Sequence, residues 1–335
     1  MTSLTVINAL ETSKALDALG SSSVDVVRQV YCDHAEGRVR EASHSFLHLP
    51  SDVRAARGIA LPSAIAGSPF FGMKWICSSP TNVDKGLPRA AGLLVLSDAD
   101  SGQPVAALPA GEISTFRTAA SAVLAVEASG LRDINSCCVI GAGRVSEAVV
   151  ALLRRRSLVG PETRLQVSDV RPERAAAFAA SVRDHLNIHA VSLVSLQRSG
   201  VLCDLLVLAT SAPAPYIERD ALRMTNGMIL HLSLRDLAPA AMASLEHWTD
   251  ARVLALGEGT SLGLAVADGI IDPSNVAELG EVLTGRRRRA QLDNKILCFS
   301  PFGLGALDLA VGVEIFRMTA AADGGTIVDE FEVGG

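Results

Sequence analysis

The stretch CCVIGAGRVSEAVVALLRRR, residues 137–156, decides the fold of this chain. It begins as a short buried strand, CCVI, and turns through Gly141-Ala-Gly143. A helix follows, because Val145, Ala148, Val149, Leu152 and Leu153 recur at the i, i+3, i+4, i+7, i+8 spacing of one helical face. A strand, a glycine turn and an amphipathic helix in this order predict the first unit of a dinucleotide-binding α/β domain.

The segments that follow repeat the alternation of strand and helix. RLQVSDV (164–170) predicts a second strand, and Pro172 opens a second helix at a position where its missing N–H costs nothing. Further strands are expected at HAVSLVSL (189–196), CDLLVLATS (203–211), GMILHLSL (227–234) and ARVLALG (251–257). Strands separated by helices favour a parallel sheet covered on both faces. We therefore predict a Rossmann-like, doubly wound domain over residues 115–305.

The two ends of the chain predict a second domain, made of residues 1–114 and 306–335. Its amino-terminal part holds short apolar segments between Pro, Gly and Ser turns, which are typical of an α+β unit. These segments are residues 58–65, 70–77, 92–98 and 103–109. The carboxy-terminal run LGALDLAVGVEIF (304–316) predicts a helix that packs back on this unit. At the boundary, Ser114 is expected to cap a helix that ends at Gly130.

Composition excludes several classes of protein. The 335 residues are 49% hydrophobic and 20% charged, which excludes a disordered chain. A formal net charge of -6 argues against a nucleic-acid partner, and no apolar run reaches the ~18 residues that span a bilayer. The six cysteines form no CxxC pair, and the histidines show no metal-ligand spacing. We expect no metal site, and a cytoplasmic protein with reduced thiols.

The glycine turn predicts the cofactor. Glycines let the backbone approach a pyrophosphate, and the start of the helix supplies N–H donors. Asp169 ends the second strand, where a carboxylate accepts hydrogen bonds from ribose hydroxyls and repels a 2′-phosphate. Arg171 weakens this preference without reversing it. The residues therefore favour NAD over NADP, and the alternative is a tight turn that binds no ligand.

Three further residues have two interpretations each. Arg117, expected in the first helical turn where the macrodipole disfavours a cation, either binds a substrate carboxylate or is a solvated surface arginine. Thr118 beside it could donate its hydroxyl to a phosphate. Lys74, inside the apolar run FFGMKWIC, either lines a pocket or extends its amine to solvent. Asp236, after a predicted strand, either faces a ligand or caps the next helix.

Several of these segments together resemble the ornithine cyclodeaminase/μ-crystallin family, over about residues 35–315. The resemblance rests on GMKWICSSPTNVDKGLPRAAGLLVLSDADSGQPVAALPAGEISTFRTAAS (72–121), VIGAGRVSEA, ATSA, LRDL and AELGEVLTG. Within the family, SHSFLHLP, SLRDL and SPFGLGALDLAV resemble the branch that makes 2,3-diaminopropionate for siderophores and antibiotics. Enzymes of that branch cleave N-(2-amino-2-carboxyethyl)-L-glutamate to 2,3-diaminopropionate, 2-oxoglutarate and NADH.

The resemblance implies a role for each matching residue. Lys74 and Arg117 would hold a substrate carboxylate, and Asp236 would be the acid/base beside the nicotinamide, with Lys74 assisting the chemistry. His44 stands where cyclodeaminases have a substrate-binding arginine, and Arg89 where they have a small hydroxyl residue, so both fit a substrate with more carboxylates. The residues implied around NAD are Thr118, Gly141, Gly143, Arg144, Val145, Asp169, Thr210, Ser233 and Ser300.

The implied reaction is the oxidative cleavage of a secondary amine. Hydride leaves the glutamate α-carbon of the neutral amine, and water activated by Asp236 adds to the resulting imine. Three alternatives stay open: an ornithine or lysine cyclodeaminase that recycles its NAD, a ketimine or imine reductase, and a non-catalytic binding protein like the crystallins. The family also implies a homodimer built on the amino-terminal domain, whose partner is otherwise a small amino-acid-derived substrate.

Overall fold

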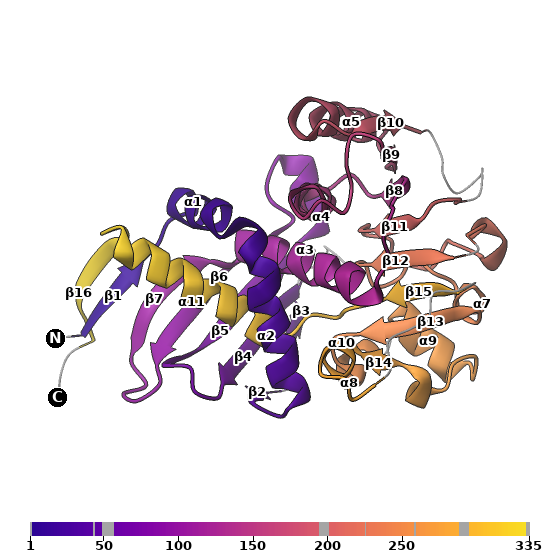
Figure 1. Ribbon diagram of the computed structural model, residues 1–335. Coiled ribbons are helices and arrows are strands. Elements are labelled where there is room, and N and C mark those ends of the chain that lie inside the picture. Colours follow the sequence, from indigo (N-terminus) through magenta and orange to yellow (C-terminus); the bar gives the residue numbers. More distant parts are fainter. Residues whose placement is uncertain are drawn as a thin grey trace. The chain divides into compact units, whose positions relative to one another are not determined.

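The computed structural model describes residues 2–42, 44–48, 57–193, 201–224, 226–257, 259–287 and 295–332. The chain divides into two compact units. Residues 118–303 form one, which we call the central unit, and residues 1–117 with 304–335 form the other, the terminal unit. Each unit is built on its own eight-stranded sheet (Figure 1).

The central unit has a parallel sheet with the strand order β10-β9-β8-β11-β12-β15-β13-β14. The strands are β8 (Ser136–Ile140), β9 (Arg164–Ser168), β10 (His189–Ser192), β11 (Leu205–Leu208), β12 (Gly227–His231), β13 (Leu245–Thr249), β14 (Ala277–Glu278) and β15 (Ile296–Phe299). Its helices are α4 (Arg144–Arg155), α5 (Pro172–Leu186), α7 (Pro239–Met242), α8 (Arg252–Ala255), α9 (Ser261–Ala267) and α10 (Leu279–Leu283). The predicted α/β class is confirmed.

The strand order reverses between β8 and β11. From β8 the chain builds outward through β9 to β10, and from β11 it builds the other way through β12. At such a reversal the two adjacent connections leave the sheet on opposite faces, and ligands of open α/β sheets bind outside the carboxyl ends of the strands there. The described residues of β11, β12 and β15 are all buried, as expected for strands covered on both faces.

Two helices of the central unit, α4 and α5, lie where the sequence predicts them. Helix α4 follows Gly143, and α5 starts at Pro172 in its first position. Helix α5 ends at Asn187, which has φ 51° and lies in the left-handed region. The segment 194–200, which includes the end of the predicted strand 189–196, lies outside the described residues.

One predicted strand of this unit is wrong. ARVLALG contains the helical turn α8, in which the Arg252 N–H donates to the Glu278 carboxylate at 2.8 Å. The strands that complete the sheet are β13 just before it and β15, inserted between β12 and β13. A short apolar run has the same composition in either conformation, so its pattern could not separate helix from strand.

The terminal unit has a mixed sheet with the order β16-β1-β7-β6-β5-β4-β2, and β3 also pairs with β4. The strands are β1 (Thr2–Val6), β2 (Val39–Glu41), β3 (Ser45–His48), β4 (Arg57–Ile65), β5 (Phe70–Ser78), β6 (Ala90–Asp98), β7 (Pro104–Pro109) and β16 (Thr326–Glu332). The helices are α1 (Ala9–Leu19), α2 (Ser23–Ala35) and α11 (Gly305–Ala321). Helix α11 packs on β4, β5 and β6 and on the helices α1 and α2, as Figure 1 shows.

The two faces of this sheet differ. On β5, Gly72 and Lys74 face α11, since a Cβ added at Gly72 would lie 3.2 Å from the Leu309 side chain. The alternate residues Phe71 and Met73 point to the other face and are both 38% exposed. Leu93 on β6 is also exposed, at 44%. The face opposite α11 is therefore apolar and uncovered in the single chain.

Helix α3 (Ala110–Ser129) begins five residues earlier than predicted, since a cap at Ser114 would place its first residue at 115. Ser114 is therefore not its cap, and Arg117 lies beyond the first turn, so the conflict with the macrodipole does not exist. The end at Gly130 is confirmed, with φ 78°. Every residue from Ala119 to Val126 is buried, which is typical of a helix enclosed on all sides.

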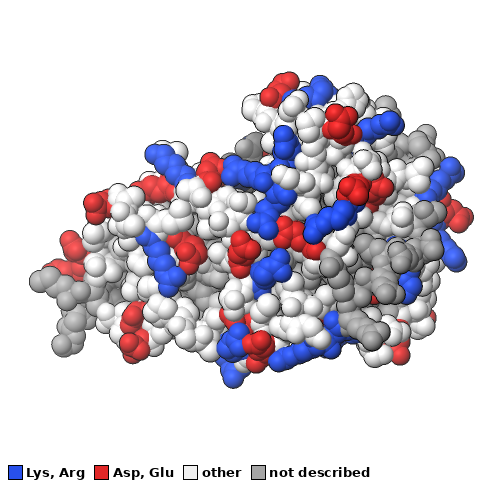
Figure 2. Space-filling view, in the orientation of Figure 1, with Lys and Arg blue, Asp and Glu red and all other residues white. Residues whose placement is uncertain are grey.

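Two surface properties complete the description. None of the helices described has the length and apolar character required to cross a membrane. On the face seen in Figure 2, acidic and basic side chains are interspersed over the described surface.

Candidate active site

The glycine turn after β8 is shaped by a close backbone approach. Gly141 has φ 97°, and a Cβ there would lie 2.4 Å from the Ala209 carbonyl oxygen after β11. Only glycine fits this position. A Cβ at Gly143 would meet no atom within 4 Å, so this glycine borders open space at the start of α4. The turn thus leaves room for a ligand beside uncapped helix N–H groups.

Asp169 lies directly after β9 and contacts this turn. Its Oδ2 accepts a hydrogen bond from the Ala142 N–H at 2.8 Å, and its Oδ1 accepts one from the Arg171 N–H at 3.0 Å. The carboxylate is therefore fixed beside the glycine turn and is only half-buried. This is the place and the orientation that ribose recognition requires.

Three hydroxyl residues predicted from the resemblance follow neighbouring strands. Thr210 lies after β11, Ser233 after β12 and Ser300 after β15. Because the strands are parallel, all three lie at the same edge of the sheet as Gly141. The fold brings these predicted cofactor residues together.

Asp236 is the centre of a buried hydrogen-bond network at this edge. Its carboxylate has no solvent exposure. Oδ1 accepts hydrogen bonds from the Thr210 hydroxyl and, at 3.0 Å, from the Tyr216 hydroxyl. Oδ2 accepts one from the Ser233 hydroxyl and lies 3.2 Å from Nε2 of His231. Burial alone would raise the pKa of Asp236, but contacts with His231, Ser233 and Thr210 outweigh it and lower that pKa.

The alternative for Asp236, a helix cap, is wrong. Helix α7 begins at Pro239, its cap position is Ala238, and no side chain caps it. Asp236 bonds side chains instead.

His231 is a member of this site that sequence reasoning missed. It is 2% exposed, and its Nδ1 lies 3.1 Å from the Ser300 hydroxyl while its Nε2 faces Asp236. A cavity of about 10 Å³, room for about one water molecule, is lined by His231, Ser233 and Ser300 among others. The sequence did offer a signal that could have identified His231, because it is the polar residue within the otherwise apolar run MILHL.

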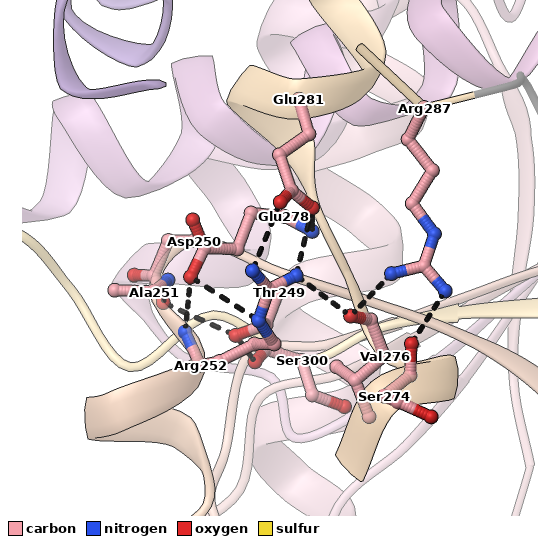
Figure 3. A network of polar contacts seen from close by, with 10 residues as sticks. All are labelled: Thr249, Asp250, Ala251, Arg252, Ser274, Val276, Glu278, Glu281, Arg287 and Ser300. Atoms are coloured by element: carbon pink, nitrogen blue, oxygen red, sulfur yellow. Dashed lines mark hydrogen bonds and ion pairs between the residues drawn. The ribbon is translucent and has the colours of Figure 1, made fainter. Parts of the chain in front are cut away.

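Ser300 is held by β13. The Thr249 hydroxyl donates to the Ser300 carbonyl at 2.9 Å, and the Ser300 N–H donates to the Trp248 carbonyl at 2.8 Å. Asp250, also fully buried, accepts from the N–H groups of Ala251 and Phe302. Figure 3 shows Thr249, Asp250 and Ser300 beside the ion pair of Arg252 with Glu281. The chain around Ser300 is therefore rigidly positioned.

A second cluster lies in the terminal unit, around Asp308 in the first turn of α11. The Lys74 amine lies 2.5 Å from Asp308 Oδ2, and Nε of Arg117 lies 3.3 Å from the same oxygen. Lys74 is 3% and Arg117 9% exposed. The expectation of a solvated surface arginine is wrong, and so is that of a lysine extending to solvent. Asp308 was not singled out from the sequence.

This cluster has more positive than negative charge in direct contact. Two cations share one oxygen of Asp308, while Oδ1 has no hydrogen-bond partner among the described residues. Burial lowers the pKa of Lys74 to about 8, with Asp308 opposing and Arg117 adding to the shift. The charge of Glu41 also raises the pKa of Lys74, so the two cations face carboxylates from β2 and from α11, and a buried pair of cations of this kind suits the binding of an anionic ligand.

The other predicted residues lie apart from these contacts. His44 precedes β3, Arg89 precedes β6, and Thr118 lies half-buried in α3. Arg144 is exposed and Val145 half-buried in the first turn of α4. No group of three His, Cys, Asp or Glu residues in the described ranges could hold a metal ion.

Two relatives of known name are similar to this chain over most of its length. An alanine dehydrogenase of Archaeoglobus fulgidus is 25% identical over 333 residues, covering 98% of this chain and 94% of the relative. An N-((2S)-2-amino-2-carboxyethyl)-L-glutamate dehydrogenase of Staphylococcus aureus is 25% identical over 285 residues, covering 82% of each. The relatives therefore differ in the substrate that their names give.

Two solved structures share the fold. A Thermococcus litoralis Delta(1)-pyrroline-2-carboxylate reductase in complex with NADH and L-proline has a TM-score of 0.89 at 20% identity, covering 96% of this chain and 99% of that one. An archaeal alanine dehydrogenase dimer with bound NAD has a TM-score of 0.86 at 22% identity, covering 98% and 100%.

The family model described as ornithine cyclodeaminase/mu-crystallin matches residues 8–320, which include the glycine turn and both buried aspartate clusters. The chain belongs to the ornithine cyclodeaminase/mu-crystallin family.

Proposed function

We propose that this protein is an NAD-dependent oxidoreductase that acts on the C–N bond of an amino-acid-derived substrate. The observation that carries the proposal is the pair of buried clusters in a chain of this family. One places Asp236 and three hydroxyl residues at the carboxyl edge of a dinucleotide-binding sheet. The other holds two buried cations. A non-catalytic binding protein has no need of both.

NAD fits the residues of the central unit. Gly143 borders open space at the start of α4, and Asp169 is fixed beside the turn. A carboxylate at this place accepts from ribose hydroxyls and repels a 2′-phosphate. The names of relatives of known structure, which include bound NADH and NAD, support the same choice.

Asp169→Ser tests the cofactor. The variant is expected to bind NAD+ about tenfold more weakly, because a charge-assisted hydrogen bond contributes on the order of 1.5–3 kcal/mol. NADP+ is expected to bind no worse than before, since a repulsion is removed as well. Fluorescence titration with both cofactors measures this, and an unchanged ratio of affinities would contradict the assignment.

The substrate that we propose is N-(2-amino-2-carboxyethyl)-L-glutamate, converted to 2,3-diaminopropionate and 2-oxoglutarate in siderophore or antibiotic biosynthesis. The number of cations in the terminal unit supports a substrate with several carboxylates. The unit has two further cations, Arg57 and Arg89, in addition to Lys74 and Arg117. Arg57 and Arg89 lie near each other, since desolvation and the like charge of Arg57 both lower the pKa of Arg89. The name of the Staphylococcus aureus relative supports the same substrate.

Strand register places Arg57 on the side of Lys74. Arg57 pairs with Ser78 and Leu61 pairs with Lys74 across β4 and β5. Positions four apart on a strand share a face, so Arg57 begins about 13 Å from Lys74 along the sheet. Long side chains converging from this separation suit the ends of one tricarboxylate. His44, one residue before β3, completes this predicted set.

In the proposed reaction the residues bind the substrate and manage protons. When bound, NAD+ supplies the hydride acceptor. Lys74 and Arg117 fix a carboxylate, which orients the adjacent amine and α-carbon. The network around Asp236 takes up a proton when water adds to the imine of the oxidised substrate, and collapse of that adduct breaks the C–N bond.

The direct test is incubation with NAD+ and a panel of amino acids and N-carboxyalkyl amino acids, with NADH absorbance as the readout. Formation of NADH and 2-oxoglutarate in equal amounts with N-(2-amino-2-carboxyethyl)-L-glutamate is expected. Ammonia from ornithine or lysine without net NADH would indicate a cyclodeaminase, and NADH consumption with cyclic imines a reductase. Either outcome would overturn the proposed substrate.

The exposed sheet face supports a homodimer. Phe71, Met73 and Leu93 form an apolar surface on the side of the sheet away from α11, and such surfaces mark interfaces. The archaeal relative of known structure is named as a dimer. Met73→Glu is expected to give monomers by light scattering, whereas Lys85→Glu, an exposed polar control, is not. A dimer that persists in Met73→Glu would contradict this interface.

The cysteines support a reducing compartment, which we propose to be the cytoplasm. All six are free, and four are buried. Burial raises the pKa of the Cys298 thiol to about 12, so this thiol is unreactive. Titration with a thiol reagent under denaturing conditions is expected to find six free thiols in protein purified without reductant.

A further inference from the structure

Asp236 is enclosed by the protein that surrounds it. Its carboxylate is fully buried, and Thr210, Tyr216, Ser233 and His231 occupy its two oxygens. A proton can reach or leave such a group only through one of these neighbours. Of the four, His231 alone has a side chain that ordinarily titrates near neutral pH.

His231 connects Asp236 with Ser300. Its Nε2 lies 3.2 Å from Asp236 Oδ2, and its Nδ1 lies 3.1 Å from the Ser300 Oγ. Both ring nitrogens therefore have polar partners on opposite sides of the ring. Nε2 also lies 3.4 Å from the Asp236 backbone N, and the step proposed below uses the tautomer whose ring hydrogen is on Nε2 and directed at Oδ2. Ser300 and His231 both line the small cavity, which has room for about one water molecule.

The three side chains form an ordered chain of acid, imidazole and hydroxyl. This is the arrangement in which a carboxylate orients an imidazole and stabilises its protonated form, while the hydroxyl faces the reacting group. A carboxylate with a lowered pKa stays ionised and suits that stabilising part. It is a weak acceptor for a proton that must be held near neutral pH.

We propose that His231 is the proton-holding residue of this site, that it receives the proton through Ser300, and that Asp236 stabilises the resulting imidazolium. The proposal assigns the uptake of the proton in the proposed function, on which it rests, to His231. In the step, a cavity water gives one proton to the Ser300 oxygen. Ser300 passes its own hydroxyl proton to Nδ1 of His231, and the hydroxide adds to the electrophilic carbon.

The surroundings contain few other groups that could take this part. The titratable side chains around the cluster are Asp236, Tyr216, Cys298 and His247. Cys298 lies 3.4 Å from the Ser300 Oγ, but burial raises the pKa of its thiol to about 12. The adjacent Arg235 is directed away, with its Nε donating to the Gly259 carbonyl.

His247 provides a matched control. It is also a buried histidine of this sheet, 4% exposed, and its Nε2 bonds the Met242 carbonyl at 3.0 Å. Among the described residues, no carboxylate is paired with it, and burial lowers its pKa to about 4. The two histidines therefore share burial and differ in the partner that would stabilise a positive charge.

The first experiment observes the proton directly. Imidazole resonances of the histidine-labelled, ligand-free protein are recorded by NMR between pH 4.5 and 9, and the signal of His231 is identified by its loss in His231→Asn. The proposal requires that this signal report protonation of the ring. Replacement of Asp236 by Asn should make the imidazolium lose its proton at a lower pH. A His231 signal that stays constant throughout, or one unaffected by Asp236→Asn, would overturn the proposal.

The second experiment follows turnover. In His231→Asn, kcat is expected to fall by about 100-fold or more, as for loss of a general base. The acid limb of the kcat profile should disappear, whereas His247→Asn should keep both the limb and the rate. Retention of the limb in His231→Asn would overturn the proposal, and circular dichroism of both variants separates this result from misfolding.

The outcomes distinguish a failure of the proposed function from a failure of the role proposed for His231. If the tricarboxylate gives no NADH, the proposed substrate is wrong, but the NMR titration still shows whether His231 holds a proton beside Asp236. If NADH forms and the His231 signal does not titrate, the proposed function stands and His231 has only a structural role.

Discussion

Two fully buried aspartates, Asp236 and Asp308, are equally enclosed and differently partnered. Neither carboxylate has any solvent exposure. Asp236 accepts from neutral hydroxyls on both oxygens and faces a histidine. Asp308 contacts two cations through one oxygen, and its other oxygen has no hydrogen-bond partner in the described part of the chain.

The difference shows how the same side chain can serve two purposes. Neutral donors satisfy a carboxylate without changing the charge of the site, so Asp236 is a fixed anion inside the central unit. Asp308 instead holds two buried cations through one of its oxygens, and two cations side by side can bind a substrate carboxylate. The first cluster is therefore suited to proton transfer, and the second to binding an anion.

The largest expected effect is that of Asp236→Asn. Asparagine keeps the shape but cannot stabilise a positive charge on His231, so kcat should fall by ~10²–10⁴. NAD+ affinity should change little, because both carboxylate oxygens are already occupied by the hydroxyls of Thr210, Tyr216 and Ser233 and by His231. NADH release and cofactor titration in the same variant measure both. Normal turnover would remove Asp236 from the chemistry.

Asp308→Asn is expected to act on stability. It leaves two buried cations without their counter-ion, and removal of one partner of a buried pair costs about 3–5 kcal/mol. Urea denaturation measures the free energy of unfolding. Glu314→Gln on the same helix is the matched control, since the Glu314–Arg317 pair is exposed and contributes about 1 kcal/mol or less. Equal stability of the two variants would show that Asp308 is not needed as a counter-ion.

Arg117→Lys is expected to lower kcat/KM by about 10–100-fold while keeping the charge, because lysine lacks the planar fork that orients a carboxylate. We expect this substitution to change the geometry of carboxylate binding and not the fold. Circular dichroism should therefore show unchanged secondary structure. Near-normal kcat/KM would mean that Arg117 serves only as a partner of Asp308.

The smallest effect is a pH dependence due to Lys74. Its pKa of about 8 means that the amine loses its positive charge as pH rises through that value. Inhibition by the product 2-oxoglutarate, which has no amine of its own, should therefore weaken above pH 8, by about tenfold per unit at most. Measured inhibition constants between pH 6.5 and 9.5 test this, with Lys74→Arg as the variant that stays charged. A constant value to pH 9.5 would contradict the role of Lys74.

Local patterns could predict the parts of this molecule that depend on neighbours in the chain. The strand, glycine turn and helix around Gly141 follow from residues within a few positions of one another, and the close approach of Ala209 explains why glycine is required. The strand predicted at 251–257 was wrong because it, too, was predicted from local pattern alone. A four-residue apolar run has no period long enough to separate helix from strand.

By itself, the sequence predicted the α/β class and the dinucleotide turn, and it singled out Lys74, Arg117 and Asp236 as candidate site residues. Only the tertiary structure decided which residues contact these side chains. Lys74 meets Asp308 across 234 positions of the chain, and His231 meets Ser300 across 69. Such contacts depend on which strands become neighbours and which helix covers them, and no local period encodes that choice. The burial that gives these charges their chemical use arises only when the elements pack together.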